Sequence, residues 1–186
     1  MRRVNRWRPP RWFRRWMITA TRAGDGWLWL AAAVVVLLTG GPQRFDAITV
    51  AGSAVISGIA VFWVLKRTAR RTRPCAIERH CWADLLPPDQ FSFPSGHSIT
   101  AFACALPLSF FYPAFAVWFF FCALSIAASR VILGLHFLSD VVVGCLIGGI
   151  LGYSSFLPFD HLKWSQHKQN EMLNSPSISL DTCISK

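Results

Sequence analysis

Residues 129–140 have the sequence SRVILGLHFLSD, in which an arginine, a histidine and an aspartate interrupt an otherwise apolar stretch. Burying such groups in apolar surroundings is costly unless they have partners and a task. If the segment from Gly134 onward is helical, His136 and Asp140 share one face, so the carboxylate can hold an imidazole nitrogen and fix its tautomer. A histidine and an aspartate that satisfy each other in a core would explain this pair equally well.

The composition around this stretch is typical of an integral membrane protein. Hydrophobic residues make up 53% of the 186 residues, and charged residues make up 15%, against roughly a quarter in soluble domains. The net charge is +10, and eight of the 19 Lys and Arg residues precede Trp27, while six more lie between Lys66 and Arg79. Arginines that flank apolar spans fit membrane orientation and anionic lipid head groups, so we expect no nucleic-acid partner.

Uncharged runs predict the membrane spans. The stretch between Asp89 and Arg130 contains one acidic or basic residue, His97. Because this stretch is too long for a single membrane crossing, Tyr112 and Pro113 are predicted to form a turn between two spans. Together with the other uncharged runs, this gives spans at 26–43, 47–65, 99–111, 113–128 and 141–159. The predicted fold class is therefore all-α, a polytopic membrane helix bundle with about five transmembrane helices.

The two ends of the chain differ from this bundle. Residues 1–26 alternate arginines with aromatics, and Trp12 and Trp16 fall on one helical face, which predicts an N-terminal interfacial helix. A signal peptide is the alternative, but no small-residue cleavage site follows the apolar region, so we expect a retained anchor. The tail at 160–186 is polar and predicted to be partly disordered. The predicted organisation is thus an N-terminal interfacial segment at 1–26, a transmembrane domain at 27–159 and a polar tail at 160–186.

Small residues and cysteines add two expectations. Gly52 and Gly58 in the second span, and four glycines in the last (Gly144, Gly148, Gly149 and Gly152), favour close helix packing. Cys75 and Cys81 share a polar loop and would form a disulfide only if that loop faces an oxidising compartment.

The order of the spans brings three polar clusters together. The ends of the second and fourth spans and the starts of the third and fifth fall on one side of the membrane. Three cations in one pocket match a tetrahedral dianion, since they would otherwise repel one another. Backbone N–H groups ahead of a helix favour an anion in the same way. The pocket is therefore predicted to contain Lys66, Arg73, Ser95, Gly96, His97, Arg130, His136 and Asp140.

Two histidines in such a pocket predict phosphoryl chemistry. His136 can attack phosphorus and His97 can protonate the departing oxygen, with no metal ligand required.

These residues also carry a resemblance to a known family. Lys66-x6-Arg73-Pro74, then Pro94-Ser95-Gly96-His97, then Ser129-Arg130-x5-His136-x3-Asp140 resemble, in residue type, spacing and order, the three-part signature of the type 2 phosphatidic acid phosphatase superfamily, which includes vanadium haloperoxidases.

The resemblance implies a role for each matching residue. His136 would become a phosphohistidine supported by Asp140, and His97 would act as acid and later activate water. It also implies hydrolysis without a metal or other cofactor, and the phosphate would be bound by Lys66, Arg73, Ser95, Gly96 and Arg130. Many bacterial members are described with six spans, whereas this sequence predicts five and an interfacial helix.

We therefore expect an integral membrane lipid phosphatase that hydrolyses a phosphomonoester or diphosphate, located in the bacterial inner membrane. A lipid-to-lipid phosphotransferase and a non-catalytic lipid-binding protein are the alternatives, and a haloperoxidase is disfavoured because those relatives are typically soluble. Phosphatidic acid, phosphatidylglycerol phosphate, polyprenyl diphosphate and lipid A phosphates present the same head group, so the sequence does not choose among them. Positive-inside counting places the pocket in the cytoplasm if five spans are present, and on the outer face if the N-terminal helix also crosses.

Overall fold

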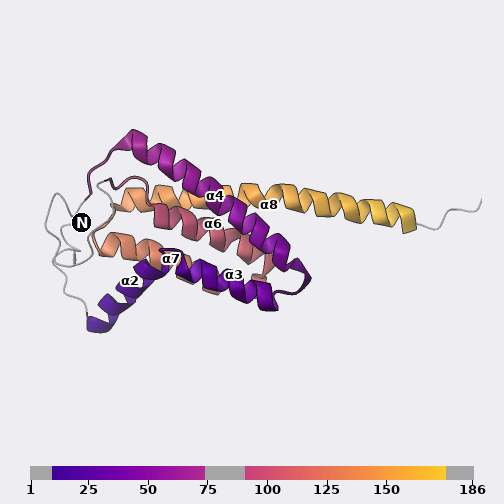
Figure 1. Ribbon diagram of the computed structural model, residues 1–186, viewed down its shortest axis with the longest axis horizontal. Coiled ribbons are helices and arrows are strands. Elements are labelled where there is room, and N and C mark those ends of the chain that lie inside the picture. Colours follow the sequence, from indigo (N-terminus) through magenta and orange to yellow (C-terminus); the bar gives the residue numbers. More distant parts are fainter. Residues whose placement is uncertain (1–9, 74–90, 175–186) are drawn as a thin grey trace, which may run out of the picture. The chain divides into compact units, whose positions relative to one another are not determined.

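The computed structural model describes residues 10–73 and 91–174. Within these ranges every regular element is a helix, and Thr72 and Phe91 form an isolated bridge. The predicted all-α class is therefore confirmed. The helices, labelled in Figure 1, are α2 (Arg11–Ala23), α3 (Trp27–Thr39), α4 (Arg44–Ala69), α6 (Gly96–Phe111), α7 (Ala116–Ile132) and α8 (Leu138–Asn174), with short 3-10 turns at Gly41–Gln43 and Pro113–Phe115.

Glycines and prolines separate the helices. After α3 ends at Thr39, Gly41 with φ +66° and Pro42 form the turn that leads the chain into α4. Pro113 follows the last residue of α6 by two positions and opens the turn into α7. The predicted turn at Tyr112 and Pro113 is therefore confirmed.

The number of spans differs from the expectation. Within the part of the chain that the structure describes, three segments are long and apolar enough to cross a membrane: Gly41–Ala69, Pro113–Ile132 and Leu138–Gln166. Helices α2 and α3 would make a fourth span if taken as one unit, although they meet at a bend of 67°. Helix α6 has 16 residues, which gives about 24 Å of helix and is less than a full bilayer core. Membrane helices are thus confirmed, but their predicted number of about five is not.

Helix α6 lies between α4 and α7 and packs against both (Figure 1). A Cβ at Gly58 on α4 would lie 2.8 Å from the Ile99 side chain, and a Cβ at Gly148 on α8 would overlap the Ile99 carbonyl oxygen. Both glycines therefore let a neighbouring helix approach α6 closely, as the sequence predicts. A Cβ at Gly52 or Gly149 would meet nothing within 4 Å, so these two glycines have no such packing role in the structure.

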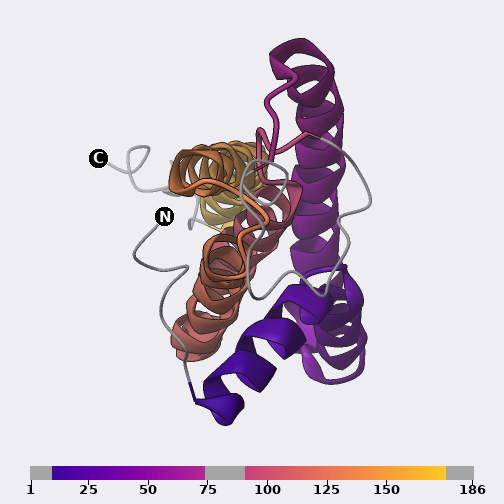
Figure 2. The ribbon, with the colours of Figure 1, turned by 90° about the vertical axis from the view of Figure 1, so that its left-hand side faces the viewer.

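Helix α2 forms as predicted, and one face of it is buried against α7. Met17 is 2% exposed and packs with Leu133 and Leu135, while Trp16 stacks on Phe121 with ring centroids 5.9 Å apart. Trp12 on the outer side is 66% exposed. Figure 2 shows α2 at the end of the bundle where α4 ends. The helix is therefore an integral part of the bundle and not only a surface anchor.

The chain divides into two compact units, Met1–Phe156 and Leu157–Lys186. The second unit contains the last part of α8, which continues to Asn174. Of the tail predicted to be polar and partly disordered at 160–186, residues 160–174 are therefore helical. Pro158 removes only one backbone donor, and the residues after it include good helix formers such as leucine, lysine, glutamine and glutamate. The remainder of the tail, at 175–186, lies outside the described residues.

Candidate active site

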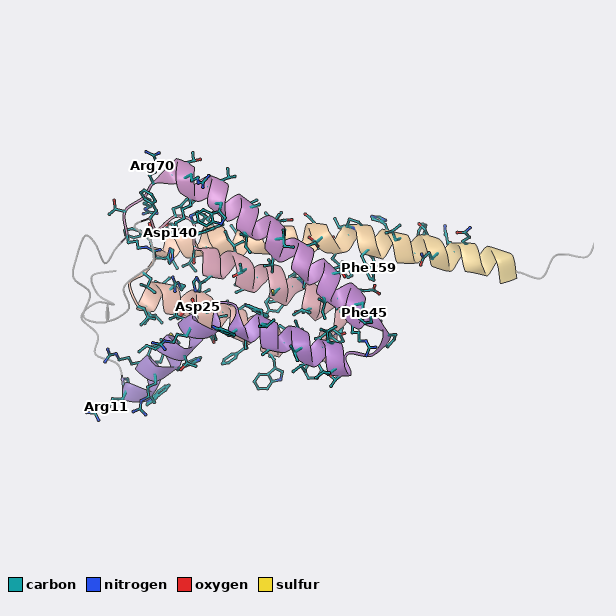
Figure 3. All side chains as sticks on the ribbon, in the orientation of Figure 1. Arg11, Asp25, Phe45, Arg70, Asp140 and Phe159 are labelled. Atoms are coloured by element: carbon teal, nitrogen blue, oxygen red, sulfur yellow. The ribbon has the colours of Figure 1, made fainter. Side chains whose placement is uncertain are left out.

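A cavity of about 600 Å³ lies at the end of the bundle where α4 ends and α6 begins. Asp25 and Asp140 lie toward this end, together with Arg70, whereas Phe45 lies at the other end (Figure 3). Six of the eight predicted site residues line the cavity: Lys66, Arg73, Gly96, His97, Arg130 and His136. Ser95 and Asp140 are fully buried and are not part of its wall.

The loops around the cavity are held by backbone hydrogen bonds. The Ser92 N–H donates to the Arg71 carbonyl at 2.7 Å, beside the bridge between Thr72 and Phe91. This pairing fixes the segment after α4 against the segment that leads into α6. After α7, the N–H groups of Leu135 and His136 both donate to the Arg130 carbonyl, at 3.1 and 3.0 Å. His136 is therefore held directly beside Arg130.

Three buried cations face this cavity. Lys66, Arg73 and Arg130 are 7%, 3% and 6% exposed. Arg73 Nη1 donates to the Leu135 carbonyl at 2.8 Å, and Arg130 Nη1 donates to the Thr21 hydroxyl at 2.7 Å. The Lys66 ammonium lies 4.6 Å from the centre of the Phe62 ring.

The imidazole of His136 is oriented by a backbone carbonyl. Its Nδ1 hydrogen-bonds the carbonyl oxygen of Ser92, and because a carbonyl only accepts, Nδ1 carries the proton. Nε2 then presents its lone pair to Arg73 Nη1 at 3.3 Å and to Arg130 Nη2 at 3.5 Å. Burial, followed by the charges of Arg130 and Arg73, holds the pKa of His136 well below its usual value. The ring is therefore neutral, with an unprotonated nitrogen among cationic donors.

Asp140 does not hold the imidazole as the sequence analysis expected. Its Oδ1 accepts from Arg71 Nη1 at 2.7 Å, and its Oδ2 accepts from the Phe137 N–H at 2.9 Å. The physical reason is the start of α8 at Leu138, which leaves His136 in the preceding loop. His136 and Asp140 therefore do not share a helical face, and Ser92, which has no side-chain signal for this role, takes the place predicted for Asp140.

Ser95 also differs from its expected position. Its hydroxyl hydrogen-bonds the Ser98 hydroxyl at 2.9 Å, and its N–H donates to the Asp140 carbonyl at 3.1 Å. Ser95 thus connects the start of α6 to the start of α8 behind the cavity. Gly96 does line the cavity, and a Cβ there would lie 3.0 Å from the Phe62 ring. The N–H groups of the first turn of α6 have no acceptor four residues earlier within the helix.

His97 has a partner that the sequence analysis missed. Its Nε2 lies 2.7 Å from Oδ1 of Asp25, in the turn between α2 and α3. The available signal was a single carboxylate between Gly24 and Gly26, directly before an uncharged run. Thr21, which accepts from Arg130, also belongs to this N-terminal part, so α2 and its turn contribute two side chains to the site.

The rest of the wall is mainly apolar. It is formed by side chains of α3, α4 and α6: Trp29, Val55, Ile59, Phe62, Trp63, Thr100 and Cys104. In the described ranges, no group of three or more His, Cys, Asp or Glu side chains is arranged to hold a metal ion. Cys75 and Cys81, whose pairing the sequence leaves open, lie outside the described residues.

The chain is similar to known proteins of one family. The PAP2 superfamily profile matches residues 46–163. The decaprenylphosphoryl-5-phosphoribose phosphatase of Mycobacterium tuberculosis is 34% identical over 137 residues, which cover 68% of this chain and 68% of that protein. The lipid A 1-phosphatase of Rhizobium etli is 34% identical over 101 residues, which cover 52% of this chain and 43% of that protein.

Solved structures show the same fold. LpxE of Aquifex aeolicus matches with a TM-score of 0.70 and 27% identity, over 83% of this chain and 91% of that one. A transmembrane PAP2-type phosphatidylglycerolphosphate phosphatase from Bacillus subtilis matches with a TM-score of 0.64 and 26% identity, over 86% of this chain and 82% of that one. The chain therefore belongs to the PAP2 superfamily, among its integral membrane lipid phosphatases.

Proposed function

We propose that the protein hydrolyses a phosphomonoester or diphosphate of a membrane lipid through a phosphohistidine formed on His136. The observation that carries this proposal is the state of the imidazole. Ser92 keeps the proton on Nδ1, so Nε2 is the available nucleophile, and it lies within 3.5 Å of two guanidinium groups. A phosphate held by those guanidiniums has its phosphorus next to Nε2.

The buried cations supply the phosphate site. Lys66, Arg73 and Arg130 bind the non-bridging oxygens, where their charges stabilise the charge that develops in the transition state. The N–H groups in the first turn of α6, at Gly96 and His97, add donors at the positive end of the helix. Ser95 supports this site indirectly, because its hydrogen bonds tie α6 to α8.

The reaction proceeds in two balanced steps. Nε2 of His136 attacks phosphorus, the bond from phosphorus to the lipid oxygen breaks, and His97 donates a proton to that oxygen. Water then attacks the phosphohistidine and gives a proton to His97, while the P–N bond breaks. The products are the dephosphorylated lipid and phosphate, and both histidines return to their starting states. No step requires a metal ion.

The apolar side of the cavity fits the lipid part of the substrate. Trp29, Ile59 and Trp63 place hydrocarbon and aromatic surface beside the cationic end. The relatives are named for decaprenylphosphoryl-5-phosphoribose, lipid A and phosphatidylglycerolphosphate, all of which are lipids that carry a phosphate. These features support the proposal of a lipid phosphate substrate, and we propose the bacterial inner membrane as the location of the protein.

The test uses purified protein in detergent and measures phosphate release from phosphatidic acid, phosphatidylglycerol phosphate, a polyprenyl diphosphate and lipid A. At least one of these lipids is expected to release phosphate with EDTA present, and ³²P-labelled substrate is expected to label His136 transiently. His136→Ala is expected to lose activity at least 10³-fold, whereas His161→Ala, at an exposed position of α8, retains it. Hydrolysis by a folded His136→Ala variant would disprove the mechanism. Transfer of the label to an added lipid instead of water would identify a phosphotransferase.

A further inference from the structure

We propose that Asp25 is the positioning residue for His97, so that the turn between α2 and α3 completes the active site. This inference rests on the proposed function, in which His97 protonates the departing oxygen. The PAP2 match begins at residue 46, so the turn lies outside the matched region.

The hydrogen bond defines which nitrogen of His97 carries a proton. Asp25 Oδ1 lies 2.7 Å from Nε2, and an ionised carboxylate only accepts, so Nε2 is the donor. The proton that His97 exchanges with the substrate is then carried by Nδ1. The Asp25 side chain is 55% exposed and that of His97 is 23% exposed, which places the pair at the solvent-facing part of the cavity wall.

The turn is shaped to hold Asp25 against the ring. A Cβ at Gly24 would lie 2.9 Å from Cδ2 of His97 and 2.7 Å from the Ile126 side chain, so only glycine fits this close approach. Gly26 has φ +114°, a conformation that favours glycine, and it lets the chain bend by 67° between α2 and α3. Glycines on both sides of Asp25 therefore bring its carboxylate to Nε2.

The electrostatics of the cavity give this carboxylate a task. Burial, followed by the charge of Arg130 from α7 and then that of Arg73 from the segment after α4, lowers the pKa of His97 to about 4. Lys66 and His136 line the same cavity. Among the described residues that line the cavity, Asp25 is the acidic one, and its hydrogen bond and charge raise the pKa of His97 against that lowering, which favours the protonated ring. A general acid surrounded by phosphate-binding cations needs such a partner to carry its proton.

Helix α2 is anchored to the rest of the site as well. Thr21 accepts a hydrogen bond from Arg130, and Met17 packs on Leu133 and Leu135 in the loop that leads to His136. The helix that precedes Asp25 is therefore held by Arg130, which also contacts His136, and by the loop that leads to His136.

The experiment compares two substrates that differ in their need for an acid. One is dodecyl phosphate, whose alkoxide must be protonated as it leaves. The other is a nitrophenyl phosphate with the same alkyl chain, whose phenolate leaves without a proton. Values of kcat/KM are measured for the wild type, Asp25→Asn, Asp25→Glu and the control Asp160→Asn, an exposed aspartate on α8.

Asp25→Asn is expected to lower kcat/KM for dodecyl phosphate about 10- to 100-fold, within the range of general acid catalysis. The value of kcat/KM for the nitrophenyl substrate should change less than about threefold. Asp25→Glu should recover part of the kcat/KM for dodecyl phosphate that Asp25→Asn loses, because it restores the negative charge. Asp160→Asn should match the wild type. An equal loss on both substrates, or no loss on either, overturns the proposed role of Asp25. Absence of phosphate release by the wild type from every substrate would instead disprove the proposed function.

Discussion

Nδ1 of His136 donates a hydrogen bond to the carbonyl oxygen of Ser92, so a backbone group and not a carboxylate sets the tautomer of the nucleophile. Ser92 itself is positioned by the N–H bond that it donates to Arg71 across the loop. The orientation of the imidazole thus depends on the pairing of two segments that are distant in sequence.

Ser92→Ala tests whether the backbone carbonyl of residue 92, and not the side chain, orients the His136 imidazole. The Ser92 hydroxyl makes only a 3.3 Å hydrogen bond to the Thr72 carbonyl, and the carbonyl that orients His136 is retained in the variant. We expect kcat/KM to stay within about threefold of the wild type, with a loss of stability of about 1 kcal/mol. Phosphate-release kinetics and thermal unfolding in detergent provide the measurements. A loss comparable to that of His136→Ala would show that the hydroxyl is needed instead.

The acid limb of the pH profile tests the state of His136. Because burial, Arg130 and Arg73 lower its pKa, the ring stays neutral as the pH falls through the usual value of a histidine. The limb of kcat/KM that reports protonation of the nucleophile is therefore expected well below pH 6.5. Steady-state kinetics from pH 4.5 to 8 would detect it. A loss of kcat/KM centred near pH 6.5 and caused by His136 would contradict the structure.

The sequence indicated the broad arrangement of this site because its strongest signals are apolar runs and their ends. The break at Tyr112 and Pro113 was predictable from proline chemistry, and counting spans was enough to place Lys66, His97 and Arg130 at one end of the bundle. The number of spans was not predictable in the same way. Helices α3 and α6 are shorter than a bilayer core, and a bend such as that between α2 and α3 depends on tertiary packing.

The finer details of the site have physical reasons for escaping sequence analysis. Ser92 acts through its carbonyl, which every residue has, so its identity carries no signal. Asp140 was placed on the wrong partner because the helix begins at Leu138 and not at Gly134, which leaves His136 in the preceding loop. Asp25 reaches His97 only because Gly24 and Gly26 fold the chain back, and 72 residues separate the two side chains.

The pairing of Asp140 with Arg71 predicts a coupled pair of variants. Arg71 is 43% exposed and Asp140 is fully buried, so removal of either partner breaks the same ion pair. We expect Asp140→Asn and Arg71→Gln each to lower the free energy of unfolding, and the double variant to lose less than the sum of the two, with a coupling of about 1 kcal/mol. Unfolding in detergent measures the four stabilities of this double-mutant cycle, and phosphate-release assays measure the activity of each variant. A large activity loss in Asp140→Asn with a fully active Arg71→Gln would favour a direct role of Asp140 on His136.

Neighbouring glycines on α8 offer a matched test of the helix packing that supports the site. A Cβ at Gly148 would overlap the carbonyl oxygen of Ile99, whereas a Cβ at Gly149 would meet nothing within 4 Å. Gly148→Ala must therefore push α8 away from α6, close to the first turn that carries His97, and we expect it to cost about 1–3 kcal/mol of stability. Gly149→Ala carries the same change in composition and helix propensity without the overlap, so it should be neutral or slightly stabilising. Thermal unfolding of both variants in one detergent measures the difference, and equal stability of the two would mean that α6 and α8 are not in close contact at Ile99.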